Sequence, residues 1–320
     1  MVARASDLDL NDAPAKGSRL FLVDGNGLAY RAYYALPEDL ATADGFPTNA
    51  LLGFASMLFK LLVDYRPQGV IVAWDEKPTR RLELDPDYKS TRRPTPPLLK
   101  EQQPHLRPIV EAFGYRNLSV LGNEADDVIG TLSRLADEAG IPTCIVSTDR
   151  DAFQLVSERV CLMMTPRGVS DVMVYTPERV EQRLGVPHTA VPDLIGLKGD
   201  TSDDIKGVPG IGDKTAAELL QRYGTIEGIY EHIEEIGGPK RREALVANRT
   251  EVMKSRVLGT IVRDLEELAD FDVEHLVNAA PDRSQLGEIF RRFEFRNLLN
   301  RLDELEAAVP AAQRTPLPVA

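Results

Sequence analysis

The sequence predicts an α/β fold in which a mostly parallel sheet is followed by a helical region. In the first half of the chain, short apolar runs alternate with segments of helical pattern. This alternation is typical of parallel sheets that helices cover on both faces. After about residue 175 the apolar runs fade, and helical pattern continues to about Leu305. We therefore expect a sheet domain over residues 19–175 and a helical region over residues 176–306.

Each helix and strand of the first half is predicted from the pattern of apolar residues in its own segment. Residues 50–64 have apolar side chains on most sides and are expected to form a well-buried helix. Residues 126–139 form an amphipathic pattern that stops at Gly140, as a helix does. The strands are expected at three short apolar runs, namely 19–23, 69–74 and 143–146.

Caps and glycines mark the helices of the second half. Thr176 followed by Pro177 is typical of a helix N-terminus. Another helix is expected from Lys214 to Tyr223, ending at Gly224. The ends of the chain show no periodicity, so we expect a disordered tail at 1–18 and a tail or linker at 307–320.

The composition limits which kinds of metal site and which cellular location we expect for the protein. The two cysteines, Cys144 and Cys161, belong to no Cys/His metal motif, which argues against a soft-metal site. The longest apolar stretch, 51–63, is too short to span a membrane and contains Lys60. The N-terminus lacks the pattern of a signal peptide. We expect no membrane partner and a location in the cytoplasm, in association with the nucleoid.

Carboxylates follow the predicted strands. Asp24, Asp75 and Asp149 each come at the end of an apolar run, and the carboxyl ends of parallel strands meet at one edge of a sheet. Any single aspartate there is more often a helix cap or a turn residue. Five acidic segments that behave alike are harder to explain in this way. The other acids of the series are Glu124, Asp126, Asp127, Asp151, Asp200 and Asp203.

Crowded carboxylates predict a metal site. They repel one another unless a cation binds them, and ligands that are all oxygen suit Mg²⁺ or Mn²⁺. Two such ions about 4 Å apart can activate water and stabilise an in-line phosphoryl displacement. The net charge of −12 argues, taken alone, against a nucleic-acid partner. Metal-binding acids, however, lower the formal charge without repelling a substrate once the ions are bound.

A basic segment follows Asp75. Residues 77–100, which we call the arch segment, hold seven lysines and arginines, several prolines and Tyr88. A solvated loop is one interpretation. The other is a mobile element that contacts phosphates and stacks a base on Tyr88.

A glycine-rich turn precedes the helix at Lys214. Gly207, Gly210 and Gly212 let backbone amides approach a phosphate, and the helix N-terminus attracts the anion. The glycine spacing is not that of a P-loop. We expect a hairpin over about 192–224 that grips duplex DNA without reading its sequence.

Together these motifs resemble the 5′ nuclease domain of bacterial DNA polymerase I and its stand-alone relatives. The glycine turn resembles the helix–three-turn–helix of that family. The other matching stretches, in chain order over about residues 19–305, are 23–32, 73–75, 88–89, 124–127, 148–151, 199–203 and 293–299.

The resemblance implies a PIN-like nuclease fold and a structure-specific 5′ nuclease. Such an enzyme cuts 5′ flaps and trims 5′ ends with two or more Mg²⁺ or Mn²⁺ ions, in primer removal and repair. It also implies DNA with a flap, nick or 5′ end as substrate, RNA–DNA hybrids included, a DNA polymerase as partner, and a monomer. A K⁺ ion is implied at the glycine turn.

The resemblance also assigns residues. Asp24, Asp75, Glu124, Asp126 and Asp127 would serve the first metal ion, Asp200 and Asp203 the second, and Asp149 and Asp151 lie between. Arg81, Lys89 and Arg92 would act in catalysis by holding the scissile phosphate and the threaded 5′ strand. The DNA contacts would be Arg31, Tyr88, the three turn glycines, Lys214 and Thr215.

Two positions depart from the family pattern, and two other interpretations stay open. Asp204 stands where the family usually has Asn, and Lys206 where it usually has Pro. The segment between Arg80 and Tyr88 is also atypical. A PIN-type ribonuclease would share the carboxylates but lack the glycine turn and the helical half. A DNA-binding protein without chemistry would lack carboxylates of the second metal site, whereas Asp200 and Asp203 are present.

Overall fold

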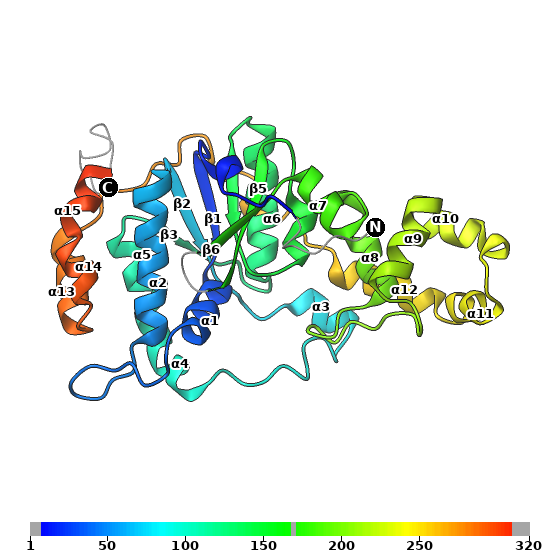
Figure 1. Cartoon of the computed structure of the whole chain (residues 1–320), viewed down its shortest axis with the longest axis horizontal. Coiled ribbons are helices and arrows are strands. Elements are labelled where there is room, and N and C mark those ends of the chain that lie inside the picture. The colour runs from blue at the N-terminus through cyan, green and yellow to red at the C-terminus, as the bar shows by residue number, and fades with distance from the viewer. Residues whose placement is uncertain (1–7, 168–170, 309–320) are drawn as a thin grey trace.

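The computed structural model describes residues 8–167 and 171–308 (Figure 1). Its centre is a six-stranded sheet in the order β3-β2-β1-β4-β5-β6. Neighbouring strands are parallel from β3 to β5, and β6 is antiparallel to β5. The predicted α/β class with a mostly parallel sheet is confirmed. The strands are β1 (Leu20–Asp24), β2 (Gly69–Ala73), β3 (Arg116–Leu118), β4 (Thr143–Val146), β5 (Val160–Arg167) and β6 (Asp171–Tyr175).

The strand order places a ligand crevice beside β1. The chain adds β2 and β3 on one side of β1 and then β4 on the other. In open parallel sheets, such a reversal leaves a crevice at the carboxyl ends of the strands. Asp24 is the last residue of β1, and Asp149 lies three residues beyond the end of β4. The topology therefore brings these two aspartates to the same crevice.

Helices cover both faces of the sheet (Figure 1). Phe21 and Val23 of β1 point into a core that α2 and α5 close, whereas Leu20 and Leu22 point into a second core that α6 closes. Such burial on both faces explains why the strands are continuous apolar runs. The helices of this half are α1 (Gly25–Ala35), α2 (Asn49–Lys60), α3 (Thr79–Leu84), α4 (Pro97–Gln102), α5 (Leu106–Ala112) and α6 (Ala125–Glu138), and a π-helical turn, Leu61–Tyr65, continues α2.

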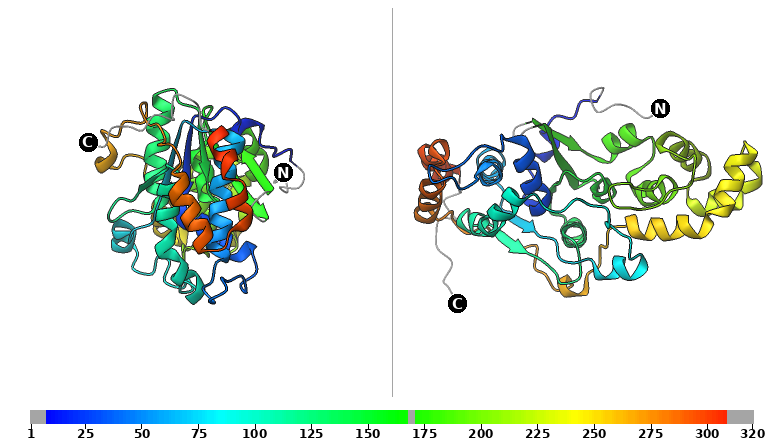
Figure 2. Two further views of the ribbon diagram at one scale, coloured as in Figure 1. Left: turned by 90° about the vertical axis from the view of Figure 1, so that its left-hand side faces the viewer. Right: turned by 90° about the horizontal axis from the view of Figure 1, so that it is seen from below.

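A helical region with its own apolar core follows the sheet. Thr176 caps the first of its helices through its side chain, as predicted, and Gly224 ends the predicted helix at Tyr223. Figure 2 shows α9 to α11 at the end of the molecule farthest from the C-terminal helices. The helices of this region are α7 (Pro177–Leu184), α8 (Val191–Lys198), α9 (Asp213–Tyr223), α10 (Ile226–Glu231), α11 (Pro239–Ala247) and α12 (Arg249–Gly259).

The last three helices do not lie with that region. After α12 the chain returns along the sheet domain, where the side chain of Asn278 accepts the Val70 N–H at 2.7 Å. The helices α13 (Arg283–Arg292), α14 (Arg296–Asn300) and α15 (Leu302–Ala308) then pack beside α2 and α5. They do so because Phe290 and Phe293 bury their rings in the core of that side. The expected division of the chain at residue 175 stays a prediction, but residues 176–306 are not one region in space.

The expected tail at 1–18 is wrong for residues 8–18. Leu10 and Ala15 are buried, and the Leu10 carbonyl accepts the Val174 N–H at 3.0 Å. The Tyr65 hydroxyl also donates to Asp12 at 3.1 Å, and the Arg179 guanidinium donates to the Asn11 carbonyl at 2.9 Å. Residues 1–7 and 309–320 lie outside the described residues. Within the described ranges, no helix is both long and apolar enough to cross a membrane.

Candidate active site

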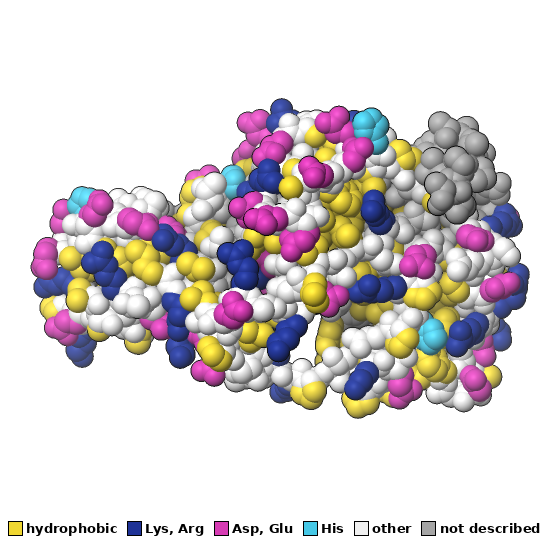
Figure 3. Space-filling model, turned by 180° about the vertical axis from the view of Figure 1, so that it is seen from behind, with side chains coloured by type: hydrophobic (Ala, Val, Ile, Leu, Met, Phe, Trp, Pro, Cys, Tyr) yellow, Lys and Arg dark blue, Asp and Glu magenta, His cyan; other side chains and the backbone are white. Residues whose placement is uncertain are grey.

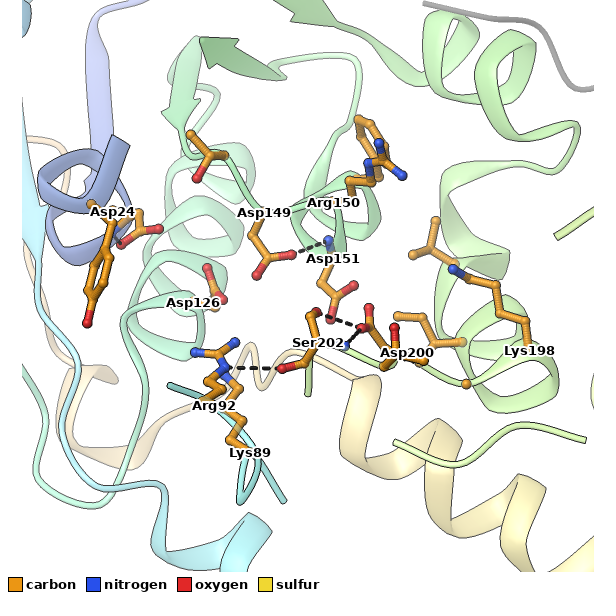
Figure 4. A pocket seen from close by; sticks show the side chains of 18 of the residues that line it. Asp24, Lys89, Arg92, Asp126, Asp149, Arg150, Asp151, Lys198, Asp200 and Ser202 are labelled. Atoms are coloured by element: carbon orange, nitrogen blue, oxygen red, sulfur yellow. Dashed lines mark hydrogen bonds between the residues drawn. The ribbon is translucent and has the colours of Figure 1, made fainter. Parts of the chain in front are cut away.

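Six of the nine predicted metal ligands line one pocket at the carboxyl edge of the sheet. The pocket has a volume of about 1080 Å³ and extends to the start of α9. Figure 4 shows Asp24, Asp126, Asp149, Asp151 and Asp200 around the pocket, with Lys89 and Arg92 approaching from the arch segment. The six are Asp24, Asp75, Asp126, Asp149, Asp151 and Asp200.

Backbone hydrogen bonds orient three of these carboxylates. Asp24 is the N-cap of α1 and accepts the Gly27 N–H at 2.8 Å. Asp75 accepts the Ala125 N–H, at the first residue of α6, at 2.9 Å. Asp149 accepts the Asp151 N–H at 2.9 Å. The structural roles expected of single aspartates are therefore present, and each fixes a carboxylate at the rim of the pocket.

Burial and mutual repulsion raise the pKa values of several of these carboxyl groups. Burial raises the pKa of Asp24 to about 7, and the charges of Asp75 and Asp149 add to the shift. Burial likewise raises the pKa values of Asp126 and Asp151, and the charge of Asp149 acts in the same direction on both. The Asp126 Oδ1 atom is buried and has no hydrogen-bond partner among the described residues. Anionic oxygens in such surroundings call for a cation.

The donor set fits a hard divalent ion. All six groups offer carboxylate oxygens, which Mg²⁺ and Mn²⁺ prefer. Within residues 8–167 and 171–308, no three His, Cys, Asp or Glu side chains are grouped closely enough to hold one ion as they stand. Small side-chain rotations are therefore part of the metal binding that we propose below.

The other three predicted ligands do not line the pocket. Glu124, Asp127 and Asp203 are buried and paired with arginines and lysines of the arch segment. Lys89 contacts both Glu124 and Asp203, the latter at 3.3 Å. Burial acts to raise the pKa of Asp203, but Lys89 and Arg92 outweigh it and lower that pKa. Lys89 and Arg92 thus favour the charged form of Asp203, and the metal-ligand role of all three residues stays a prediction.

Arg81 is a link between elements and does not face the pocket. Its guanidinium donates two hydrogen bonds to Asp127, at 2.6 and 2.8 Å. It also donates to the Leu258 and Thr260 carbonyls, each at 3.1 Å. Only 12% of the side chain is exposed. In this arrangement every face of the guanidinium is used within the protein, so the predicted phosphate contact of Arg81 is not available.

Tyr88 is likewise unavailable for the predicted stacking on a base. The residue is only 5% exposed, because its ring packs in the core beneath α6. Its hydroxyl donates to Glu124 at 2.9 Å and lies 3.2 Å from the Asp203 carboxylate. The sequence shows an aromatic residue in a basic segment, but it does not show that the ring turns inward.

Asp204 connects the arch segment to the turn before α9. Its carboxylate accepts the Thr91 N–H at 2.8 Å and the Thr91 hydroxyl at 2.6 Å. Its own backbone has a φ of 58°, a conformation that Asn, Asp and Gly tolerate best. Two residues earlier in the arch segment, the Lys89 N–H donates to the Asp203 carbonyl at 3.0 Å. Asp204 thereby helps to position the segment that carries Lys89 and Arg92.

For the nuclease activity that the family resemblance implies, we expect Asp204→Gly to lower kcat/KM on a flap substrate about tenfold, the effect of losing two exposed charge-assisted hydrogen bonds. Glycine removes the carboxylate without straining the positive φ. Asp204→Asn keeps an acceptor and should stay within about threefold of wild type. Adding Thr91→Val to Asp204→Gly should lower kcat/KM little further, because both substitutions remove the same contact. Steady-state cleavage rates check this, and a wild-type rate for Asp204→Gly would show that the contact positions nothing.

The glycine turn has the predicted shape between α8 and α9. Gly210 has a φ of 81°, in the region that favours glycine. A Cβ on Gly207 would lie 2.1 Å from the Lys198 carbonyl oxygen, so the two arms of the turn can approach only at a glycine. Gly212 then caps α9, whose first turn carries the exposed Lys214. Exposed backbone amides at a helix N-terminus suit a phosphate.

Several residues that line the pocket were not predicted. Arg150 and Lys198 stand on the side opposite the arch segment (Figure 4), and Lys198 lies 3.2 Å from Asp213. Arg31, which was predicted, also lines the pocket. Arg150 could have been found, since it lies between Asp149 and Asp151. Lys198 carries no such signal, because only the fold of the turn brings it there.

Comparisons with known proteins identify both halves of the chain. Residues 19–185 match the family model of the 5′-3′ exonuclease, N-terminal resolvase-like domain, and residues 186–284 match that of the 5′-3′ exonuclease, C-terminal SAM fold. DNA polymerase I of Bacillus subtilis is 39% identical over 287 residues, which are 89% of this chain and 32% of that protein. DNA polymerase I of Mycobacterium tuberculosis is 39% identical over 292 residues, which are 90% of this chain and 32% of that one. The chain therefore spans about a third of the length of these relatives.

Solved structures share the fold. The T5 5′-exonuclease with bound zinc is similar at a TM-score of 0.64 and 20% identity, with 90% of this chain and 99% of that chain covered. The catalytic core of Rad2 in complex with a DNA substrate gives 0.62 at 16% identity, covering 92% and 93%. Flap endonuclease-1 from Methanococcus jannaschii gives 0.59 at 16% identity, covering 98% and 97%.

Proposed function

The chain belongs to the 5′-3′ exonuclease family, and from this we propose that it is a structure-specific 5′ nuclease that hydrolyses DNA phosphodiesters at 5′ flaps and 5′ ends. The observation that carries the proposal is the pocket of six carboxylates beside β1, where the strand order of the sheet reverses. The family models cover the helical half as well as the sheet domain, which argues against a short PIN-type ribonuclease.

We assign the chemistry to two divalent ions held by the pocket carboxylates. Bound there, such ions supply an activated water and stabilise the attacking and leaving oxygens of the displacement. Asp24 and Asp126 would hold one ion, Asp151 and Asp200 the other, and Asp149 would contact both. The choice between Mg²⁺ and Mn²⁺, and a K⁺ ion at the glycine turn, belong to the same proposal. The divalent zinc ions bound to the T5 5′-exonuclease support it.

The cations of the arch segment would grip the substrate. Lys89 and Arg92 now neutralise Glu124 and Asp203 at the edge of the pocket. A phosphate that enters beside the metal ions offers these cations an anionic partner of the same kind. We therefore propose that Lys89 and Arg92 exchange carboxylate partners for the scissile phosphate, while Arg81 keeps its partner. The exchange would leave the buried carboxylates of Glu124 and Asp203 without these cations, a cost that the nearby divalent ions would have to offset.

The substrates and partners that we propose are those of DNA replication and repair. One T5 flap endonuclease structure is a complex with DNA and metal ions, and the Rad2 structure contains a DNA substrate. We propose DNA with a flap, nick or 5′ end as substrate, RNA–DNA hybrids included, and action as a monomer in the cytoplasm. The polymerase relatives support a DNA polymerase as partner.

Metal binding should stabilise the fold, and more so at high pH. Burial raises the pKa of Asp24 to about 7, above its unfolded value. In EDTA, the stability that its neutral form contributes is therefore lost as pH rises through about 7. We expect the Tm in EDTA to fall by a few degrees more between pH 5.5 and pH 8 for wild type than for Asp24→Asn. Mn²⁺ should raise the wild-type Tm more at pH 8 than at pH 5.5. An equal rise at both pH values would contradict the link between metal binding and the ionisation of Asp24.

The proposed function is tested by cleavage of three labelled substrates. A 5′-flap duplex, a blunt duplex of the same sequence and single-stranded RNA would be incubated with Mg²⁺, with Mn²⁺ and with EDTA. We expect metal-dependent cutting of the flap near its junction and little cutting of the RNA. Preferred cutting of the RNA would favour the ribonuclease interpretation. Tight flap binding without cutting by either metal would indicate a binding protein on a nuclease fold.

A further inference from the structure

A second cavity adjoins the active-site pocket. It has a volume of about 330 Å³, at the lower end of the range in which proteins bind small ligands. Asn26, Tyr30 and Asp75 belong to the walls of both spaces, so the cavity opens directly beside the carboxylates. Its other lining residues are Ala29, Trp74, Leu99, Gln103, Pro104, Leu106 and Arg107.

The position of the cavity defines which part of a DNA strand could reach it. The pocket extends to Gly212 and Asp213, where the glycine turn would grip a duplex. The carboxylates that would cut lie between that turn and Asp75, the wall of the second cavity. A strand that leaves the duplex and presents its phosphate to the carboxylates continues past Asp75. The portion that arrives there lies 5′ of the cut and is single-stranded.

The arch segment leaves room for this path. The hydroxyl groups of Tyr30 and Thr95 lie 2.8 Å apart, so the arch segment meets α1 just before α4 begins. Residues 92–96, just before α4, have no regular secondary structure and run below the body of the protein (Figure 1), and the space-filling view shows a gap between the two (Figure 3). The cavity lies at the α4 end of the gap, because Leu99 of α4 is part of its wall.

The cavity presents one cation in a fixed place. The Arg107 guanidinium lies over the Trp74 ring, 5.4 Å from the ring centre, and the residue is exposed. Trp74 is held in turn by its Nε1–H, which donates to Asn117 at 2.8 Å. The Asn117 amide in turn donates to the Arg107 carbonyl at 3.1 Å, so Arg107, Trp74 and Asn117 contact one another in a ring. A guanidinium that is held in this way and still exposed suits a phosphate.

We propose that this space, which we call the flap cavity, binds a nucleotide of a single-stranded 5′ flap, with Arg107 as the contact to its phosphate. Gln103, exposed at the rim, offers an amide to the base or sugar. The inference rests on the proposed nuclease function. Its consequence is selectivity by flap length, since a flap of one nucleotide ends near Asp75 and a longer flap reaches Arg107.

The test compares Arg107→Ala with wild type on flaps of one and of about six nucleotides. For the long flap, we expect KM to rise about five- to tenfold, the loss of one exposed charge-assisted contact. The slope of log KM against log salt should also fall by about 0.7, the value for one phosphate contact on a single strand. For the one-nucleotide flap, both quantities should stay at wild-type values. Arg107→Lys, which keeps the charge, should recover part of the loss.

Two further variants keep the test decisive. Arg116→Ala is the matched control, because Arg116 is also exposed and lies over an aromatic ring, that of Phe271, outside both spaces. It should cleave both flaps as wild type does. Gln103→Glu adds an anion at the rim without removing the Arg107 contact to Trp74, and it should impair only the long flap. Equal effects of Arg107→Ala on both flaps, or none, would overturn the flap cavity. Failure of the wild type to cut either flap would instead overturn the proposed function.

Discussion

Asp149→Asn is expected to lower the cleavage rate of a flap duplex by at least about 10³-fold while the Kd for the same duplex stays within about threefold. Asp149 follows β4 and lies between the carboxylates of the two proposed ion sites. Asparagine has nearly the same shape and can still accept the Asp151 N–H, so the loop should keep its conformation. The substitution therefore removes charge at the metal site and leaves the glycine turn and the arch segment intact.

Single-turnover cleavage and fluorescence anisotropy would measure these two quantities. Asp264→Asn is the matched control, because Asp264 is exposed and lies outside the pocket, and it should retain the wild-type rate. A weakened Kd for Asp149→Asn equal to its loss of rate would mean that Asp149 acts in binding. A rate near that of wild type would remove Asp149 from the metal site.

Arg81→Ala is expected to reduce the free energy of unfolding by about 3–5 kcal/mol, the usual cost of removing one partner of a buried ion pair. Arg81 and Asp127 expose only 12% and 1% of their side chains. Without Arg81, the Asp127 carboxylate would keep backbone partners, among them the Val262 N–H, but would lose its neutralising cation. Arg81→Lys keeps a charge but cannot make the paired hydrogen bonds, so it should recover only part of the stability.

Urea unfolding would measure the loss, with Arg134→Ala as control. Arg134 lies on α6, as Asp127 does, and pairs with Glu138, but their side chains are 32% and 59% exposed, and such pairs contribute about 0–1 kcal/mol. If Arg81→Ala unfolded at the wild-type urea concentration yet cut DNA poorly, the role in catalysis implied by the family resemblance would be correct. The structural role that the contacts indicate would then be wrong.

The sheet could be predicted in part because its central strands carry a strong signal. β1, β2 and β4 are buried on both faces and are therefore continuous apolar runs. β3 has three residues that are only partly buried or exposed, so no apolar run marks it. β5 lies between β4 and β6, whereas β6 is an edge strand that is paired on one side only. Both carry short apolar runs, at 160–164 and 172–175, which the prediction above does not include.

The site could be predicted to the level of the carboxyl edge and no further. The strand ends identify Asp24, Asp75 and Asp149 because the side chains follow the backbone of the sheet. Which way a side chain of the arch segment turns depends on contacts distant in sequence. Tyr88 meets Asp203, 115 residues away, and Arg81 meets the Leu258 carbonyl, 177 residues away. The local sequence pattern does not show such distant partners. This explains why Tyr88 was expected to stack on a base and Arg81 to bind a phosphate.

The most direct test of the account is a crystal structure of the protein with Mn²⁺, recorded at a wavelength where manganese scatters anomalously. We predict two anomalous peaks about 4 Å apart in the pocket. One should contact Asp24 and Asp126, the other Asp151 and Asp200, and Asp149 should contact both. Carboxylates that bind no ion, in crystals of a protein that cleaves DNA in the same buffer, would contradict the account.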